Sequence, residues 1–486
     1  MTKFNQKYEP VIGLEVHAQL LTKTKLFCSC STKFGNNPNS NVCPVCLGHP
    51  GVLPVVNKTA VKFAIMMGIA TNCKINRHSI FARKNYFYPD LPKGYQISQY
   101  EEPLCENGII KISKKDGGEK YIRIKRIHLE EDAGKSVHDK SDSTLIDVNR
   151  CGVPLIEIVT EPDISSPEEA NLFLMKIKQL VQYLEICDGN MEEGSLRCDA
   201  NISVRLKGDN KLGVKTEIKN MNSFRNVERA LEYEINRQID CLEDGEDIIQ
   251  QTLLWNAELE QAFSMRTKEE EQDYRYFPDP DLTPLFVDEN WLSEIKGSIP
   301  QLPDARLKRF IESYSLPLYD AEILTQDKNI ADYYELVVKN LKDYKLASNW
   351  VMVDIMSVLN SKNISIKEFT VQPENLSKLI SLISNNTISN KIAKDIFQIM
   401  IETNQDPETI VKERDLVQIT DDKTITEIVE KVIDSHPEQL KDFLAGKEKV
   451  VGFFVGQIMK LTKGKANPQL VNKILISELN NKKNKL

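Results

Sequence analysis

The sequence predicts an α+β protein in which a β-rich part precedes a helical part. In residues 1 to about 290, short runs of alternating apolar and polar residues are separated by glycine, proline and Asn-Gly turn signals. After Pro300, amphipathic helical patterns follow one another to the end of the chain, with almost no strand signal. Between the two parts, residues 295–300 have the composition of a linker.

Three segments carry the clearest strand pattern. Residues 11–20 alternate, with Glu15 and His17 on the polar face. The apolar face of this segment consists of Ile12, Leu14, Val16, Ala18 and Leu20. Residues 196–206 alternate in the same way, with Arg197 on the polar face and the inward positions predicted at Cys198, Ala200, Ile202, Val204 and Leu206. Residues 212–218 place Lys215, Glu217 and then Lys219 on one face.

Helices are predicted at about 167–186 and 223–243 within the β-rich part. In the second part, helical patterns cover about 304–313, 328–342, 345–360, 374–384, 389–403, 424–433, 437–445, 450–462 and 468–480. Prolines stand at positions typical of a first helical turn, namely Pro303, Pro317, Pro373, Pro407, Pro437 and Pro468.

Composition narrows the class of protein. The chain has 486 residues, enough for two to four domains, and no run of 18 apolar residues that could span a membrane. It begins without the apolar core of a signal peptide, so a cytoplasmic location is expected.

A net charge of −8 argues against bulk nucleic-acid binding, yet residues 441–486 hold ten lysines against three acids. This asymmetry predicts that a polyanion binds at one end of the chain only.

Four cysteines near the N-terminus predict a structural zinc site. Cys28 and Cys30 form one close pair, and Cys43 and Cys46 form another after a short loop. Two thiolate pairs joined by a loop suit tetrahedral zinc, and a site with four thiolates has no open position for chemistry. The alternatives are a redox pair at Cys43 and Cys46, or four unrelated buried cysteines.

Charged residues recur on the predicted strands. Glu15 and His17 share a face, residues 127–132 contain four ionisable groups, and Glu157 lies within an apolar run. Carboxylates with an imidazole on rigid strands suit Mg²⁺ and nucleotide phosphates, and interspersed basic residues suit phosphate oxygens. The alternative is a solvated sheet face. Neither a phosphate-binding loop of the Gly-x-x-x-x-Gly-Lys-Ser/Thr type nor a dinucleotide fingerprint occurs, so an ATP site would be of another type.

Residues 83–99 interleave aromatic and basic side chains, among them Lys84 and Tyr86, and residues 273–281 form a second run of this kind. Such a segment can stack on and clamp the end of a nucleic acid. The alternative is a loop held in place by its own aromatic residues.

These segments together resemble the B-subunit family of the Asp/Glu-tRNA(Asn/Gln) amidotransferases. The resemblance extends over essentially the whole chain and is strongest at 11–17, 50–57, 83–90, 128–135, 191–201, 273–278, 455–460 and 466–469. The four cysteines match the zinc-containing branch of the family.

The resemblance implies three domains. Residues 1–295 would form a glutamine-synthetase-like cradle with an antiparallel sheet and the zinc loop 28–46, residues 296–408 a helical domain, and residues 409–486 a YqeY-like tail that contacts tRNA.

The resemblance also implies a reaction. The cradle would use ATP and Mg²⁺ to phosphorylate the side-chain carboxylate of Glu-tRNA(Gln) or Asp-tRNA(Asn). Ammonia channelled from an amidase, the A subunit, would then displace the phosphate, and a small C subunit would complete the heterotrimer.

The resemblance assigns roles to individual residues. Catalysis and Mg²⁺ binding fall to Glu15, His17, Glu130, Glu131 and Glu157. ATP or phosphate binding falls to Arg197, Lys215, Glu217 and Lys219. Contacts with tRNA are expected at Lys84, Tyr86, Lys460, Lys463 and Lys465, and zinc binding at Cys28, Cys30, Cys43 and Cys46. The alternatives are a glutamine-synthetase-type ligase that acts on a free small molecule, and a noncatalytic scaffold that binds tRNA. The sequence does not choose between the two tRNA substrates.

Overall fold

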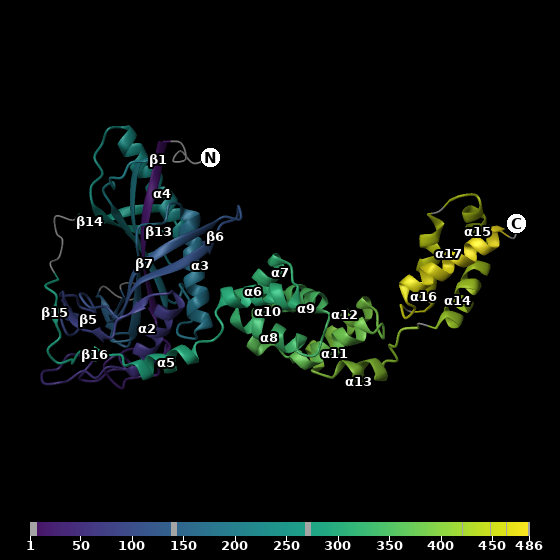
Figure 1. The fold of residues 1–486 in the computed structure, drawn as a ribbon, viewed down its shortest axis with the longest axis horizontal. Helices are drawn as coiled ribbons and strands as arrows, with labels where there is room; N and C mark the ends of the chain where they lie inside the picture. The colour runs from purple at the N-terminus through teal and green to yellow at the C-terminus, as the bar shows by residue number, and fades with distance from the viewer. Residues whose placement is uncertain are drawn as a thin grey trace. The chain divides into compact units, whose positions relative to one another are not determined.

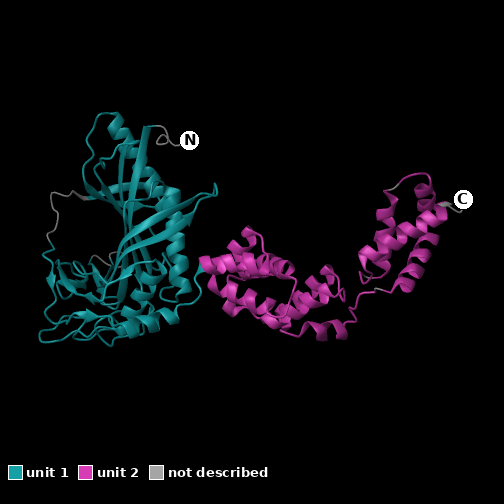
Figure 2. Cartoon of the chain, viewed as in Figure 1, with its two compact units in different colours: residues 1–303 teal, residues 304–486 magenta. Residues whose placement is uncertain are grey.

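The structure is a computed structural model that describes residues 7–137, 143–267, 274–419, 421–447, 449–462 and 464–484. The chain divides into two compact units, Met1–Pro303 and Asp304–Leu486 (Figure 2). The first contains the strands and the second is helical (Figure 1), which confirms the predicted α+β class.

The first unit is built on a nine-stranded sheet in the order β14-β13-β12-β11-β1-β10-β7-β6-β2. Neighbouring strands are antiparallel except β12 and β13, which are parallel. The strands are β1 (Tyr8–Gln19), β2 (Lys74–Ile75), β6 (Cys105–Ser113), β7 (Glu119–Glu131), β10 (Pro154–Thr160), β11 (Leu196–Leu206), β12 (Thr216–Lys219), β13 (Gln251–Asn256) and β14 (Gln261–Thr267). Short pairings at its margins involve β3 (His78–Ser79), β4 (Ala82–Asn85), β5 (Tyr95–Ser98), β8 (Lys135–Val137), β9 (Leu145–Asp147), β15 (Phe277–Pro278) and β16 (Leu285–Phe286).

Helices cover one face of this sheet. Helix α2 (Lys58–Ala70) packs on β6 and β7, α3 (Pro167–Tyr183) on β6, and α4 (Phe224–Glu243) on β11 and β14. The inward residues predicted for β1 are buried in the core under these helices, and so are those predicted for β11 except Leu206, which is 50% exposed at the strand end. Because side chains alternate along a strand, the polar residues of β1 and β11 face away from the helices.

Two helices of the first unit were not predicted from the sequence, α2 and α5 (Glu289–Ser298). Helix α2 is apolar nearly all round and largely buried, so it lacks the polar stripe by which an amphipathic helix is found.

The second unit consists of helices around two separate cores. The helices are α6 (Pro303–Tyr314), α7 (Leu318–Gln326), α8 (Lys328–Val338), α9 (Tyr344–Asn349), α10 (Met356–Lys362), α11 (Pro373–Ser384), α12 (Asn390–Thr403), α13 (Pro407–Glu413), α14 (Asp422–Asp434), α15 (Pro437–Leu444), α16 (Val450–Leu461) and α17 (Pro468–Asn484). One core extends from Phe310 to Val411, and the other from Ile425 to Leu479. A π-helical turn at Trp350–Ile355 joins α9 to α10, so the helix predicted at 345–360 is continuous.

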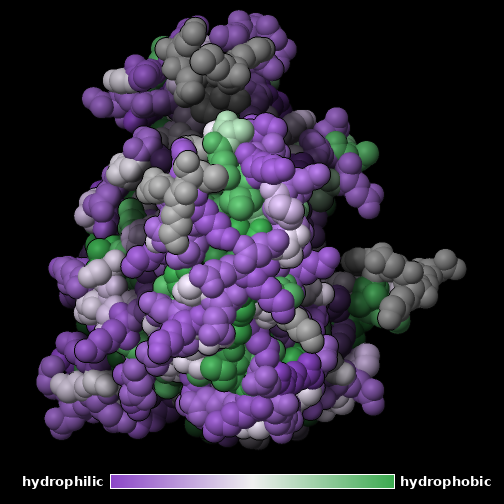
Figure 3. All heavy atoms as spheres, turned by 90° about the vertical axis from the view of Figure 1, so that its right-hand side faces the viewer, coloured by the Kyte–Doolittle hydropathy of each residue, from purple (hydrophilic) through white to green (hydrophobic). Residues whose placement is uncertain are grey.

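Within the part of the chain that the structure describes, no helix has the length and apolar content needed to cross a lipid bilayer. The face drawn in Figure 3 is dominated by hydrophilic side chains, with small hydrophobic groups between them.

Candidate functional site

A row of charged side chains crosses four adjacent strands on the face of the sheet that the helices leave free. His17 on β1 pairs with Arg197 on β11 and with Glu157 on β10, and Glu157 pairs in turn with His128 on β7. Residues directly opposite one another on neighbouring strands have their side chains on the same face at close range. The strand register therefore lines these four groups up.

The centre of this row has the donor set of a cation site. One ligand atom each from His17, Glu130 and Glu157 lies within 4.8 Å of the other two. Nε2 of His17 lies 3.5 Å from Oε1 of Glu130 and 3.7 Å from Oε2 of Glu157. Two carboxylates and an imidazole suit a divalent cation that prefers oxygen ligands. The structure thus brings together three of the five residues predicted to bind Mg²⁺.

His128 completes the cluster and was not predicted as a site residue. Its Nε2 lies 3.1 Å from Oε2 of Glu157 and 3.8 Å from Glu130. Burial would lower the pKa of His128, but the two carboxylates raise it to about 9. Burial would raise the pKa of Glu157 and Glu130, but His128 and His17 lower both. Strand alternation from Glu130 would have identified His128, because the two are separated by one residue.

Glu15 and Glu131 lie apart from this triad. Glu15 precedes His17 by two residues on β1, so its side chain lies on the same face of the sheet. It accepts a hydrogen bond from Asn201 Nδ2 at 3.0 Å. Burial and the nearby Glu157 raise its pKa. Glu131 is the neighbour of Glu130 along β7. Its carboxylate forms an ion pair with Lys93 and accepts a hydrogen bond from the Ile97 backbone N–H at 3.0 Å.

Two of the three basic residues predicted to bind phosphate, Arg197 and Lys219, have acidic partners. Nη2 of Arg197 lies 2.9 Å from Asp132 Oδ1, while its buried Nε has no hydrogen-bond partner among the described residues. Nζ of Lys219 lies 2.6 Å from Asp199 Oδ2 and 2.9 Å from Glu217 Oε1. Lys215 precedes β12 and is exposed. Arg197, Glu217 and Lys219 thus lie on the charged face, whereas Lys215 lies beyond the strand.

Lys84, predicted to contact tRNA, is within electrostatic range of Glu130 and Glu157. Its Nζ lies 4.8 Å from the centre of the Tyr274 ring. Burial would lower the pKa of Lys84, but the carboxylates of Glu130 and Glu157 raise it. Tyr86 is half-buried with its ring 6.0 Å from that of Tyr274, in an edge-to-face arrangement.

The lysines predicted to bind tRNA in the tail differ in exposure. Lys460 is exposed on α16. Lys465 is paired with Asp415, with 2.8 Å between Nζ and Oδ2. Lys463 lies outside the described residues.

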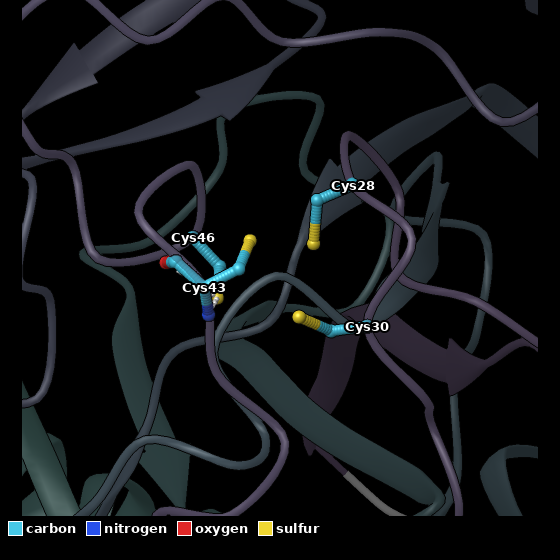
Figure 4. A group of neighbouring side chains, drawn as sticks. All are labelled: Cys28, Cys30, Cys43 and Cys46. Atoms are coloured by element: carbon cyan, nitrogen blue, oxygen red, sulfur yellow. Dashed lines mark hydrogen bonds between the residues drawn. The ribbon is translucent and has the colours of Figure 1, made fainter.

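The four cysteines converge on one point (Figure 4). Cys28 and Cys30 approach from one segment and Cys43 and Cys46 from another, with all four sulfur atoms within 4.8 Å of one another. A tetrahedral zinc ion with bonds of about 2.3 Å separates its sulfur ligands by roughly 3.8 Å. The donor set and its spacing therefore fit zinc.

A buried lysine accompanies the cysteines. Lys25 is completely buried, with its Nζ 3.6 Å from Cys46 Sγ and 3.3 Å from the backbone oxygen of Val148. A hydrogen bond from Cys28 and the charge of Lys25 lower the pKa of Cys46 to about 4, while burial raises that of Cys30 to about 11. A buried ammonium beside several thiolates offsets part of their negative charge.

Comparison with known proteins gives two family matches and many close relatives. Residues 10–293 match the GatB/GatE catalytic domain, and residues 332–479 match the GatB domain. Two relatives, from Thermodesulfovibrio yellowstonii and Caldicellulosiruptor bescii, are named as B subunits of aspartyl/glutamyl-tRNA(Asn/Gln) amidotransferase. Each is 56% identical over 97% of this chain and 99% of its own length. A relative of the same name from Chlorobium phaeobacteroides is 55% identical over the same shares.

The chain belongs to the family of tRNA amidotransferase B subunits. The predicted function, as the B subunit of a tRNA amidotransferase, is confirmed, and so is the predicted class of enzyme, a ligase that acts within a complex of several chains. Membership favours this prediction over the two alternatives, a ligase for a free small molecule and a noncatalytic scaffold.

Replacing Cys43 and Cys46 together by serine should remove one equivalent of zinc, because two of the four thiolates are lost. Metal analysis of protein purified without chelator measures the loss. The control is Cys241→Ser, which changes a cysteine outside the cluster and should leave the zinc content unchanged. Unmodified protein that contains no zinc would contradict the assignment.

Proposed function

We propose that this chain carries out the ATP-dependent half of the amidotransferase reaction on the charged face of its sheet. The substrate is the side-chain carboxylate of Glu-tRNA(Gln), of Asp-tRNA(Asn), or of both. A carboxylate is a poor electrophile at neutral pH, and its phosphorylation creates a leaving group that ammonia can displace. The observation that carries the proposal is the convergence of His17, Glu130 and Glu157 within 4.8 Å.

These three residues are the proposed ligands of Mg²⁺, with Glu15 and Glu131 as the weaker candidates because neither joins the triad. When bound, the ion neutralises negative charge on the transferring phosphoryl group. His128 holds the carboxylate of Glu157 in place through its 3.1 Å contact. Arg197 and Lys219, one and two strands beyond β1, are proposed to contact the phosphates.

The second half of the reaction is proposed to need two partners. An amidase, the A subunit, would release ammonia from glutamine and channel it to this site, and a small C subunit would complete the complex. The acyl phosphate must meet ammonia rather than water, so a closed route is required. Action on tRNA during protein synthesis supports the expected cytoplasmic location.

The zinc site is proposed to be structural. Four thiolates leave no open coordination position. The loop around them is tied to the segment before β10, where the backbone N–H of Asn41 donates to Asn149 Oδ1 at 2.7 Å. Zinc would thus stabilise the segment that leads into β10, the strand that carries Glu157.

The tail is proposed to bind the tRNA body through charge. Its lysines outnumber its acids, and Lys460 is exposed. The helices of the tail, α14 to α17, pack around a small core of their own from Ile425 to Leu479, which is separate from the helical core that precedes it.

Glu157→Gln should abolish tRNA-dependent ATP hydrolysis by the assembled complex, with a loss of about 100-fold or more, because the ligand charge disappears while the shape stays. Glu119→Gln is the matched control. It makes the same change on β7, at an exposed residue paired only with Lys111 among the described ion pairs, and should keep normal activity. A folded Glu157→Gln complex with the normal rate would overturn the proposed role.

Deletion of residues 419–486 should weaken tRNA binding and flatten its dependence on salt, because the slope falls by about one unit for each lost phosphate contact. The cut removes the second core and leaves α13 in the first. Filter binding at several salt concentrations measures both effects. Equal tRNA affinity of the shortened and full chains at every salt concentration would assign tRNA recognition to residues 1–418.

A further inference from the structure

The four cysteines of the zinc loop differ in how far solvent can reach them. Cys46 is 4% exposed, and its sulfur accepts hydrogen bonds from Lys25 Nζ at 3.6 Å and from the backbone N–H of Cys43 at 3.2 Å. Cys28, Cys30 and Cys43 are partly exposed. Reactive cysteines lie in partly exposed, electropositive surroundings, whereas buried structural cysteines are inert. The cluster therefore presents three thiolates to a small oxidant and shields the fourth.

Among the three accessible cysteines, Cys30 and Cys43 are best placed to form a disulfide. Their side chains are hydrogen-bonded to each other across the loop, and the sulfur atoms of the cluster lie within 4.8 Å of one another. A disulfide between Cys28 and Cys30 would close a very short ring, since a single residue separates them, and disulfides far from the preferred geometry are strained.

We infer that the zinc loop is a peroxide-sensitive switch, in which hydrogen peroxide joins Cys30 to Cys43 in a disulfide and the zinc is released. This goes beyond the proposed function, although it rests on the proposed zinc site. Only Cys28 and Cys46 are then left as ligands, whereas a structural zinc site requires four.

Hydrogen peroxide is the only oxidant that this reaction needs. The Cys30 thiolate attacks one peroxide oxygen, the O–O bond breaks and hydroxide leaves, so that Cys30 becomes a sulfenic acid. The Cys43 thiolate then attacks the Cys30 sulfur, an S–S bond forms, the S–O bond breaks and a second hydroxide leaves. Two protons from solvent convert the hydroxides into water. The two cysteine sulfurs together lose two electrons, and the peroxide gains them.

The loop connects a change at the cysteines to the candidate active site. Residues 33–40 are all exposed and lie outside the core, so the cysteine cluster is what holds this segment in place. The backbone N–H of Val148 donates to Asn39 Oδ1 at 2.8 Å, and Asn149 Nδ2 donates to the backbone oxygen of Asn37 at 2.7 Å. These contacts tie the loop to the segment that leads into β10, which carries one of the triad carboxylates. Loss of zinc should therefore loosen this strand and lower activity.

The test treats the zinc-loaded assembled complex with hydrogen peroxide and follows three quantities. A chromogenic chelator should detect one equivalent of released zinc, and peptide mapping should locate a disulfide between Cys30 and Cys43. Amidation of misacylated tRNA should fall about tenfold, the order expected when the support of a metal ligand is lost. Dithiothreitol followed by zinc should restore the activity, because a dithiol reduces a disulfide.

Cys43→His separates this reaction from oxidation elsewhere in the complex. Histidine is itself a zinc ligand, and the disulfide with Cys30 cannot form without the Cys43 sulfur. The variant should keep its zinc, and the activity of its own untreated sample, at a peroxide dose that empties the wild-type site. Cys241→Ser is the matched control, because it changes a partly exposed cysteine outside the cluster. It should release zinc as the wild type does.

Three results would overturn the inference. One is zinc that stays bound to the wild type while amidation is lost, another is zinc release with unchanged amidation, and the third is an equal loss of zinc from wild type and zinc-loaded Cys43→His. If Cys43→His binds no zinc, the disulfide mapped in the wild type decides, and a disulfide between other cysteines contradicts the inference. Unmodified protein without zinc would refute the proposed zinc site and the switch with it. Zinc-loaded protein that keeps its zinc in peroxide refutes the switch alone.

Discussion

The register of β11, β1, β10 and β7 is the constraint on which the candidate site depends. His17, Glu157 and His128 meet because each is the register partner of the next, over strands that come from distant parts of the sequence. A slip of one residue in any of these strands would turn its polar side chains toward the helices and its apolar side chains toward the charged face. The apolar face under α3 and α4 therefore fixes the polar face opposite, and the hydrophobic core positions the charges.

Buried charge is costly, and the site compensates each charge with a partner. Glu157 and Glu130 have His128 and His17, Arg197 has Asp132, and Lys219 has Asp199 and Glu217. Removal of one member leaves an uncompensated charge in a water-poor environment, which destabilises a protein far more than the loss of an exposed pair. The same principle applies at the zinc loop, where Lys25 is buried beside Cys46. At both candidate metal sites among the described residues of the first unit, a partner of opposite charge thus compensates the buried charge.

The sequence predicted the fold best where a pattern was local. Alternation identified β1 and β11, and spacing identified the cysteine cluster. The sequence failed to predict α2, which has no polar stripe, and the exposure of Leu206 at the end of β11. Side chains alternate between the two faces of a strand. Alternation applied to residues 128–131 would therefore have predicted His128 on the same face as Glu130, and Glu131 on the opposite face. The electrostatic influence of Glu130 on Lys84 depends on the packing of strands far apart in the sequence, so no local pattern could reveal it.

The central claim is that this face of the sheet transfers a phosphoryl group to a carboxylate. The most direct measurement follows oxygen-18 from the labelled side-chain carboxylate of misacylated tRNA during turnover by the assembled complex. Displacement of an acyl phosphate by ammonia leaves one carboxylate oxygen on the phosphate. The account predicts that the released inorganic phosphate carries one labelled oxygen, and that Glu157→Gln releases almost none. Phosphate free of the label, formed at the normal rate together with the amide, would contradict it.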